Sequence, residues 1–217
     1  RRFDQGVYEM LQGNRRAAQR LLEEAIQIWD LKFDVDHERL PQALDYLSVL
    51  YRDEQEHAKI ESTLRRLVTL LEQRDGDEAE RLASAYFNLA VSRFLQQDSA
   101  EAETFYKKAI VLWEAKLPAE HPTLTTARGQ LGLMYLATAQ FDEAITTFQK
   151  LLAIQEKHAA PDDAIAVTLE GLAHAYRCRD DFETSLNLLS RAIKLSPQNG
   201  NLSAACGVAY YDMGRWK

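Results

Sequence analysis

The sequence predicts an all-α fold, an α-α superhelix (solenoid) of stacked antiparallel helical hairpins. Three observations predict it: a repeat of 42 residues runs through most of the chain, apolar residues inside each copy recur at helical spacing, and turn-forming residues are scarce. The 217 residues include nine Gly and five Pro, whereas average usage would give roughly 26 of the two together. All-β sandwiches need a turn about every 8–12 residues, so the composition favours helices.

The repeat is clearest in the middle of the chain. Leu131 and Gly132 follow Leu89 and Ala90 by 42 residues, and other small and large residues keep the same spacing. Because units of this length cannot bury their apolar faces alone, they must stack on one another. We therefore expect one domain, residues 1–217, with repeats at approximately 1–38, 39–80, 81–122, 123–163 and 164–198 and a partial repeat at 199–217.

Each copy in turn carries its own version of the pattern. The first is the weakest, with Ala18 standing 84 residues, two periods, before Ala102. The second has Ile60 where others have Ala or Ser, which predicts looser packing. The third to fifth are regular, and the last supplies only a first helix, followed by an expected turn at 212–214. Because a second helix is missing, we expect a chain cut from a longer protein; the alternative is that the final helix acts as a solvating cap.

The fourth copy shows why two helices are expected. Apolar residues at helical spacing run over 131–136 and again over 144–152, with polar residues between them. Asp142 is expected to cap the second helix through backbone N–H groups. Gly132 is expected to admit Phe148 where the two helices cross closely. The five prolines all fall between copies, because proline breaks a helix interior.

The order Leu, small, Tyr, then small, Ala and Pro resembles the tetratricopeptide repeat. In the fifth copy these positions are occupied by Leu172, Ala173, Tyr176, Ser185, Ala192 and Pro197. The longer 42-residue period and the turn Glu120-His121-Pro122 look like the kinesin-light-chain subtype, and His121 is expected to shape the turn before a helix. The resemblance implies a concave groove lined by the first helix of every repeat.

Counting from the Leu-small pair predicts which side chains face this groove. The candidate peptide-binding residues are Asp45, Val49, Arg52, Phe87, Asn88, Val91, Phe94, Gln130, Leu133, Leu136, Glu170, His174 and Arg177, with Tyr46, Val208 and Tyr211 on the same face. The middle of the set is apolar, which favours an exposed interaction stripe; the alternative is that these residues pack against neighbouring first helices. The resemblance also implies that Asn88 hydrogen-bonds the main chain of a bound peptide, although the other copies do not repeat this Asn. The residues of a carboxylate clamp for chaperone C-termini are not matched.

No motif for catalysis or for a cofactor is found. Phosphate-binding loops, HExxH, GxSxG and CxxC are absent, the five His are dispersed, and no local pair starts a metal site. The acidic residues Asp75, Asp77, Glu78 and Glu80 lack the spacing of a calcium loop and are expected to begin a helix. We therefore predict no enzyme activity, no cofactor and no metal.

Charge and hydropathy exclude further classes. The 33 acidic residues outnumber the 26 basic ones, which argues against nucleic acid as a partner. No run of apolar residues approaches the length of a membrane span, and the N-terminus does not resemble a signal peptide. Cys178 and Cys206 are expected to be free thiols in a reducing compartment, which favours the cytoplasm.

Two functions remain for such a chain. The first is a protein–protein interaction scaffold that holds a peptide or helix of a partner protein in its groove. The alternative is a ligand-sensing regulatory domain of a larger signalling or transcription protein. Self-association through the open C-terminal repeat is a further hypothesis about partners.

Overall fold

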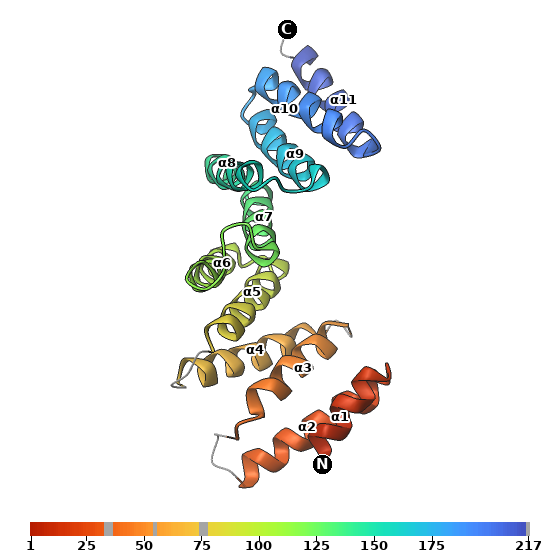
Figure 1. Ribbon diagram of the computed structural model, residues 1–217, viewed down its shortest axis with the longest axis vertical. Coiled ribbons are helices and arrows are strands. Elements are labelled where there is room, and N and C mark those ends of the chain that lie inside the picture. Colours follow the sequence, from red (N-terminus) through yellow and green to blue (C-terminus); the bar gives the residue numbers. More distant parts are fainter. Residues whose placement is uncertain (33–36, 54–55, 74–77, 216–217) are drawn as a thin grey trace. The chain divides into compact units, whose positions relative to one another are not determined.

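The computed structural model describes residues 1–32, 37–53, 56–73 and 78–215, and within these ranges every regular element is an α-helix. The helices are labelled in Figure 1. Their bounds are α1 Arg2–Leu11, α2 Arg15–Lys32, α3 Leu40–Asp53, α4 His57–Glu72, α5 Ala79–Leu95, α6 Ser99–Glu114, α7 Pro122–Ala137, α8 Phe141–Lys157, α9 Asp162–Cys178, α10 Phe182–Leu195 and α11 Gly200–Arg215. The prediction of an all-α fold is confirmed.

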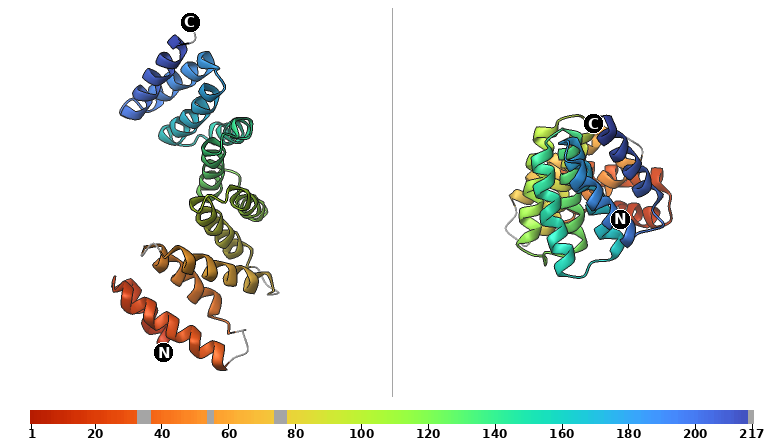
Figure 2. Two further views of the ribbon diagram at one scale, coloured as in Figure 1. Left: turned by 180° about the vertical axis from the view of Figure 1, so that it is seen from behind. Right: turned by 90° about the horizontal axis from the view of Figure 1, so that it is seen from above.

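The chain forms two compact units, Arg1–Leu112 and Trp113–Lys217. In the first unit α1 packs on α2 and α3 on α4, while α2 and α4 each pack on the helix that follows. In the second unit α7 packs on α8 and α9 on α10, and α8 and α10 likewise contact the next helix. Figures 1 and 2 show these antiparallel pairs from opposite sides. That both units belong to one repeat domain stays a prediction.

Small residues lie where helices cross. Ala90, Ala102, Ala144 and Ala173 have no exposed surface, and neither do many other alanines of the core. A close crossing lies in the second unit, where the ring of Phe148 from α8 lies against glycines of two helices. A Cβ added at Gly132 of α7 or at Gly171 of α9 would lie 2.7 Å from Phe148 Cζ. The predicted approach of Phe148 to Gly132 is confirmed, and Gly171 makes a second approach of the same kind.

Four hairpins turn on a residue in the left-handed backbone region. These residues are Gly13 between α1 and α2, Gln97 between α5 and α6, Ala139 between α7 and α8, and Asp180 between α9 and α10, with φ between 57° and 79°. The residue after a helix commonly adopts this conformation because it lets backbone N–H groups bond the last carbonyls. Accordingly, the N–H of Ala139 donates to Leu136 O and that of Gln140 to Tyr135 O.

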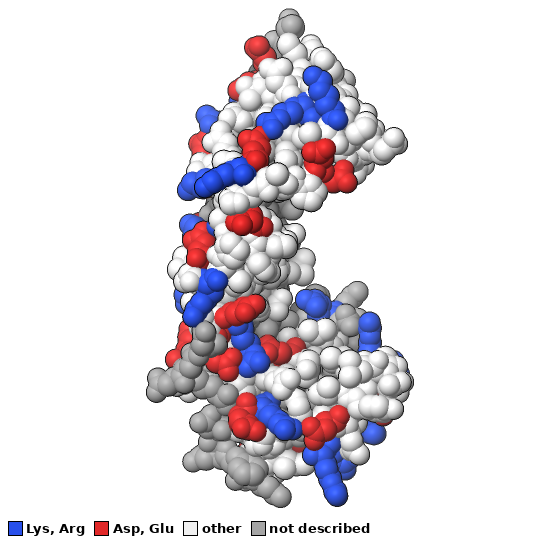
Figure 3. All heavy atoms as spheres, in the orientation of Figure 1, with Lys and Arg blue, Asp and Glu red and all other residues white. Residues whose placement is uncertain are grey.

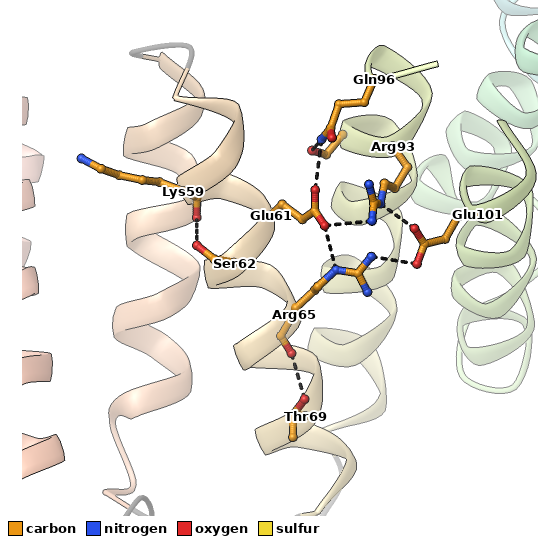
Figure 4. A network of polar contacts seen from close by, with 9 residues as sticks. Lys59, Glu61, Ser62, Arg65, Thr69, Arg93, Gln96 and Glu101 are labelled. Atoms are coloured by element: carbon orange, nitrogen blue, oxygen red, sulfur yellow. Dashed lines mark hydrogen bonds and ion pairs between the residues drawn. The ribbon is translucent and has the colours of Figure 1, made fainter. Parts of the chain in front are cut away.

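A network of ion pairs joins three helices of the first unit (Figure 4). Glu61 of α4 accepts from Arg65 Nε at 2.8 Å, and its Oε1 also lies 2.9 Å from Arg93 Nη2 of α5 in an ion pair. Glu101 of α6 accepts from Arg65 Nη2 at 2.8 Å, and its other carboxylate oxygen lies 2.6 Å from Arg93 Nε in an ion pair. Hydrogen bonding to Arg65 is the main cause that holds the pKa of Glu61 below its usual range. Two carboxylates and two guanidinium groups thus alternate around a closed ring.

Some local predictions are correct and others are wrong. His121 is the N-cap of α7, with Nδ1 accepting from Thr123 N–H at 3.3 Å, as expected of a residue that shapes this turn. The prediction that Asp142 caps α8 is wrong. The helix begins at Phe141 and its N-cap is Gln140, so Asp142 lies in the first turn, where its carboxylate pairs with Arg179. The expected turn at 212–214 is also wrong, because α11 continues through it to Arg215.

The expectations for proline and for the acidic segment have mixed outcomes. Pro41 and Pro122 lie inside the first turns of α3 and α7, where the missing N–H costs nothing, so the statement that prolines lie only between copies is too strict. Glu78 is the N-cap of α5 and Glu80 lies in its first turn, as predicted. Asp75 and Asp77 fall outside the described residues.

Candidate binding groove

The predicted groove residues of the first unit lie on α3 and α5. Asp45, Val49 and Arg52 belong to α3, and Val49 and Arg52 are exposed. On α5, Phe87, Asn88, Val91 and Phe94 are all half-buried rather than exposed. The ring of Phe87 meets that of Tyr106 on α6 edge to face, with centroids 5.6 Å apart. Phe87 thus contacts the second helix of its own repeat, a neighbour that neither the exposed stripe nor the alternative of packing against neighbouring first helices had named.

Asp45 links α3 to α5, two of the first helices of this unit. Its Oδ2 lies 3.1 Å from Arg81 Nε of α5, and the Arg81 guanidinium also reaches Glu78 at 3.0 Å. Burial raises the pKa of Asp45 to about 6, and the nearby charge of Glu78 adds to the rise while Arg81 opposes it. Asp45 is therefore a partly desolvated acid whose charge changes close to neutral pH.

In the second unit a cavity of about 340 Å³ opens between the first helices α7, α9 and α11. Five of the predicted residues line it: Leu133, Leu136, Glu170, His174 and Arg177. The other lining residues are Val167, Gly171, Ser185, Leu189, Ala205 and Val208. Val208 was expected on this face, whereas Val167, one turn before Glu170, was missed although its helical spacing places it there. Gln130 is exposed on α7 and is not part of the lining.

The rim of this cavity is apolar and accessible. Leu133, Val167 and Val208 are 48%, 60% and 46% exposed, and each comes from a different first helix. Among the described residues of this unit, the other large apolar side chains that are exposed are Tyr210 and Tyr211. Exposed apolar residues that gather at one concave place indicate a binding site more strongly than the same residues scattered singly.

The polar groups of the cavity differ in their partners. Arg177 Nη1 donates to Asp212 Oδ2 of α11 at 2.7 Å, so its charge is balanced within the protein. Burial lowers the pKa of His174 below its usual range, and the charge of Arg177 lowers it further. Glu170 has no ion pair within the part of the chain that the structure describes. The cavity therefore carries one uncompensated carboxylate and a neutral imidazole at pH 7.

Chemistry other than binding finds little support in the described residues. No group of three or more His, Cys, Asp or Glu that could hold a metal ion occurs among them. Cys178 and Cys206 are free, and burial raises the pKa of both thiols, which disfavours the reactive thiolate. None of the described helices is long and apolar enough to span a bilayer.

Figure 3 shows basic and acidic side chains interspersed over the face drawn.

The tetratricopeptide repeat family profile matches residues 81–157 and 123–198, which together cover more than half of the sequence. The chain belongs to the tetratricopeptide repeat family. No curated protein sequence matches it.

Solved structures of tetratricopeptide proteins share the fold. A Podosopora anserina protein with nearly identical kinesin-light-chain TPR-like repeats superposes with a TM-score of 0.76 at 18% identity, covering 92% of this chain and 95% of its own. BtubC (BKLC) from P. vanneervenii gives 0.72 at 17% identity, covering 94% and 84%. YrrB, described as a TPR protein with an unusual peptide-binding site, gives 0.69 at 15% identity, covering 94% and 88%. The predicted tetratricopeptide fold with kinesin-light-chain-like repeats is confirmed.

Proposed function

We propose that this tetratricopeptide chain is a non-enzymatic protein-interaction scaffold that binds a peptide segment of a partner protein in the groove of its first helices. The tetratricopeptide fold supports a protein-interaction scaffold in general. The observation that carries the specific proposal is the cavity of the second unit, where three first helices present apolar side chains to solvent. YrrB, which shares the fold, is described as having a peptide-binding site.

The proposed contact follows from the arrangement of the lining. A helix or an extended segment laid across α7, α9 and α11 would cover Leu133, Val167 and Val208 together. Removing apolar surface from water contributes about 25 cal/mol per Å², and clustered contacts of this kind carry most of the affinity of a small interface. The ligand-sensing alternative is not favoured by the family match or by the solved structures, which are tetratricopeptide repeat proteins.

A displayed random-peptide library tests this proposal. The wild-type chain is compared with Leu133→Gln/Val208→Gln, which makes the rim polar without adding charge. Leu31→Gln/Val111→Gln is the matched control, because it also replaces one exposed Leu and one exposed Val, here on the second helices α2 and α6. We expect peptides retained by the wild type and by the control to be lost from the rim variant. Equal retention by all three proteins, or by none, would refute the proposal.

A further inference from the structure

The cavity of the second unit is lined by ionisable side chains as well as by apolar ones. These ionisable side chains are Glu170, His174 and Arg177, and their partners decide which of them can act on a ligand. Arg177 is engaged with Asp212 across α9 and α11, at 2.7 Å, with both side chains only 26% exposed. A half-buried pair of this kind offers little net field to a third group, because each charge compensates the other.

Glu170 is the group left to meet a ligand. It lies on α9 between Val167 and His174, one turn from each, and its carboxylate has no ion pair within the described ranges. His174, whose pKa lies below its usual range, is uncharged at neutral pH, so it does not compensate Glu170. The chain as a whole is acidic, with a formal net charge of −7. This net charge also attracts cations weakly, in addition to the charge of Glu170.

We propose that the cavity takes a peptide in which an apolar side chain stands next to a lysine or arginine, the apolar group entering between Leu133, Val167 and Val208 and the cation pairing with Glu170. This inference rests on the proposed function and names the chemistry of its partner. An acidic peptide would place its carboxylate beside Glu170 and would find Arg177 already paired. Selectivity therefore comes from both an attraction and a repulsion.

The contribution of the charge is limited but measurable. Ion pairs at exposed or partly exposed sites contribute about 0.2–1 kcal/mol, and 1.4 kcal/mol corresponds to a tenfold change in affinity. Neutralising Glu170 should therefore lower the affinity for a basic peptide by up to about fivefold at low salt. The difference should shrink at high salt, because screening weakens accessible charge pairs.

The experiment compares the peptides selected by two proteins and then measures their binding. The same displayed library is selected on the wild type and on Glu170→Lys, and retained peptides are bound, as fluorescein-labelled synthetic peptides, to wild type, Glu170→Gln and Glu170→Lys at 50 mM and 500 mM NaCl. Glu143→Lys is the matched control, because Glu143 is an exposed carboxylate on α8 outside the cavity lining. Circular dichroism of each variant verifies the fold.

The expected result is enrichment of Lys or Arg beside an apolar residue on the wild type and on Glu143→Lys, with Asp or Glu replacing them on Glu170→Lys. The selected basic peptides should bind Glu170→Gln more weakly, and this loss should disappear at 500 mM NaCl. Retained peptides without a charge preference, or an unchanged affinity in Glu170→Gln, would overturn this inference and leave the proposed function standing. If the wild type retains no peptide that the Leu133→Gln/Val208→Gln variant loses, both fail together.

Discussion

Gly132 offers the sharpest test of how the repeats pack. Replacing it with Ala adds one methyl carbon 2.7 Å from Phe148 Cζ and 2.8 Å from Cε1, far inside van der Waals contact. The ring has no room to move away from Gly132. Phe148 is only 2% exposed, and its ring also lies so close to Gly171 that a Cβ placed there would be 2.7 Å from Phe148 Cζ. Overpacking of this kind costs about 1–3 kcal/mol.

Gly129 is the control on the same helix. A Cβ there would lie 3.8 Å from Leu151 Cδ2, an ordinary contact. Both substitutions gain the higher helix propensity of Ala over Gly, about 1 kcal/mol, so the difference between them isolates the crowding. We expect Gly129→Ala to raise the free energy of unfolding. The free energy of unfolding of Gly132→Ala should be about 1–3 kcal/mol lower than that of Gly129→Ala.

The assay is urea unfolding followed by far-ultraviolet circular dichroism, repeated in a Phe148→Leu background. A smaller side chain at 148 should reduce the difference between the two glycine variants, which is the coupling that a double-mutant cycle measures. If Gly132→Ala and Gly129→Ala unfold at the same urea concentration, or if Phe148→Leu leaves their difference unchanged, then Phe148 does not determine the need for glycine at this crossing.

Two further predictions concern charge in the first unit. The pKa of Asp45 is raised to about 6, so the folded chain holds this proton more tightly than the unfolded chain; the resulting stabilisation is fully present below about pH 3.8 and is lost as the pH rises through about 6. Asp45→Asn should therefore flatten the dependence of the unfolding midpoint on pH between 4 and 7, and an unchanged profile would contradict this. For Glu61, whose pKa is lowered, the stabilisation is present above its ordinary pKa of 4.5 and is lost as the pH falls through the lower folded value. Glu61→Gln should destabilise the chain by up to about 1 kcal/mol at pH 7 and low salt, and the same loss at 1 M NaCl would show that the ion pairs of the network are not its cause.

The sequence predicts the helices and their crossings well because these depend on local rules. Apolar spacing identifies both helices of the fourth copy, and the small residue at 132 indicates where a facing ring must enter. Capping is predicted less well. The segment that begins α8 contains three polar residues, Gln140, Asp142 and Glu143, and nothing local distinguishes the N-cap from the first turn. The Asp142 carboxylate binds Arg179, which lies 37 residues away in the sequence.

The candidate site shows a similar limit. Val91 and Leu133 occupy the same register, two residues after the Leu of the Leu-small pair, and the sequence treats them alike. In the structure Val91 is half-buried, while Leu133 is 48% exposed at a cavity rim. Register determines the face of a helix, but burial depends on the helices next to it. The pairing of Arg177 with Asp212, which leaves Glu170 as the available charge, also lies beyond what periodicity predicts.

The left-handed residues between hairpin helices bear on how these repeats diverge. The same backbone turn is made by Gly13, Gln97, Ala139 and Asp180, so the turn tolerates four different side chains. A non-glycine residue there gives up roughly 1 kcal/mol relative to glycine, an amount that inter-helix packing can absorb. Substitutions can therefore accumulate in the turns while the backbone path persists. Solved structures only 15–18% identical to this chain still superpose on most of its length, so this fold does not require particular side chains in its turns.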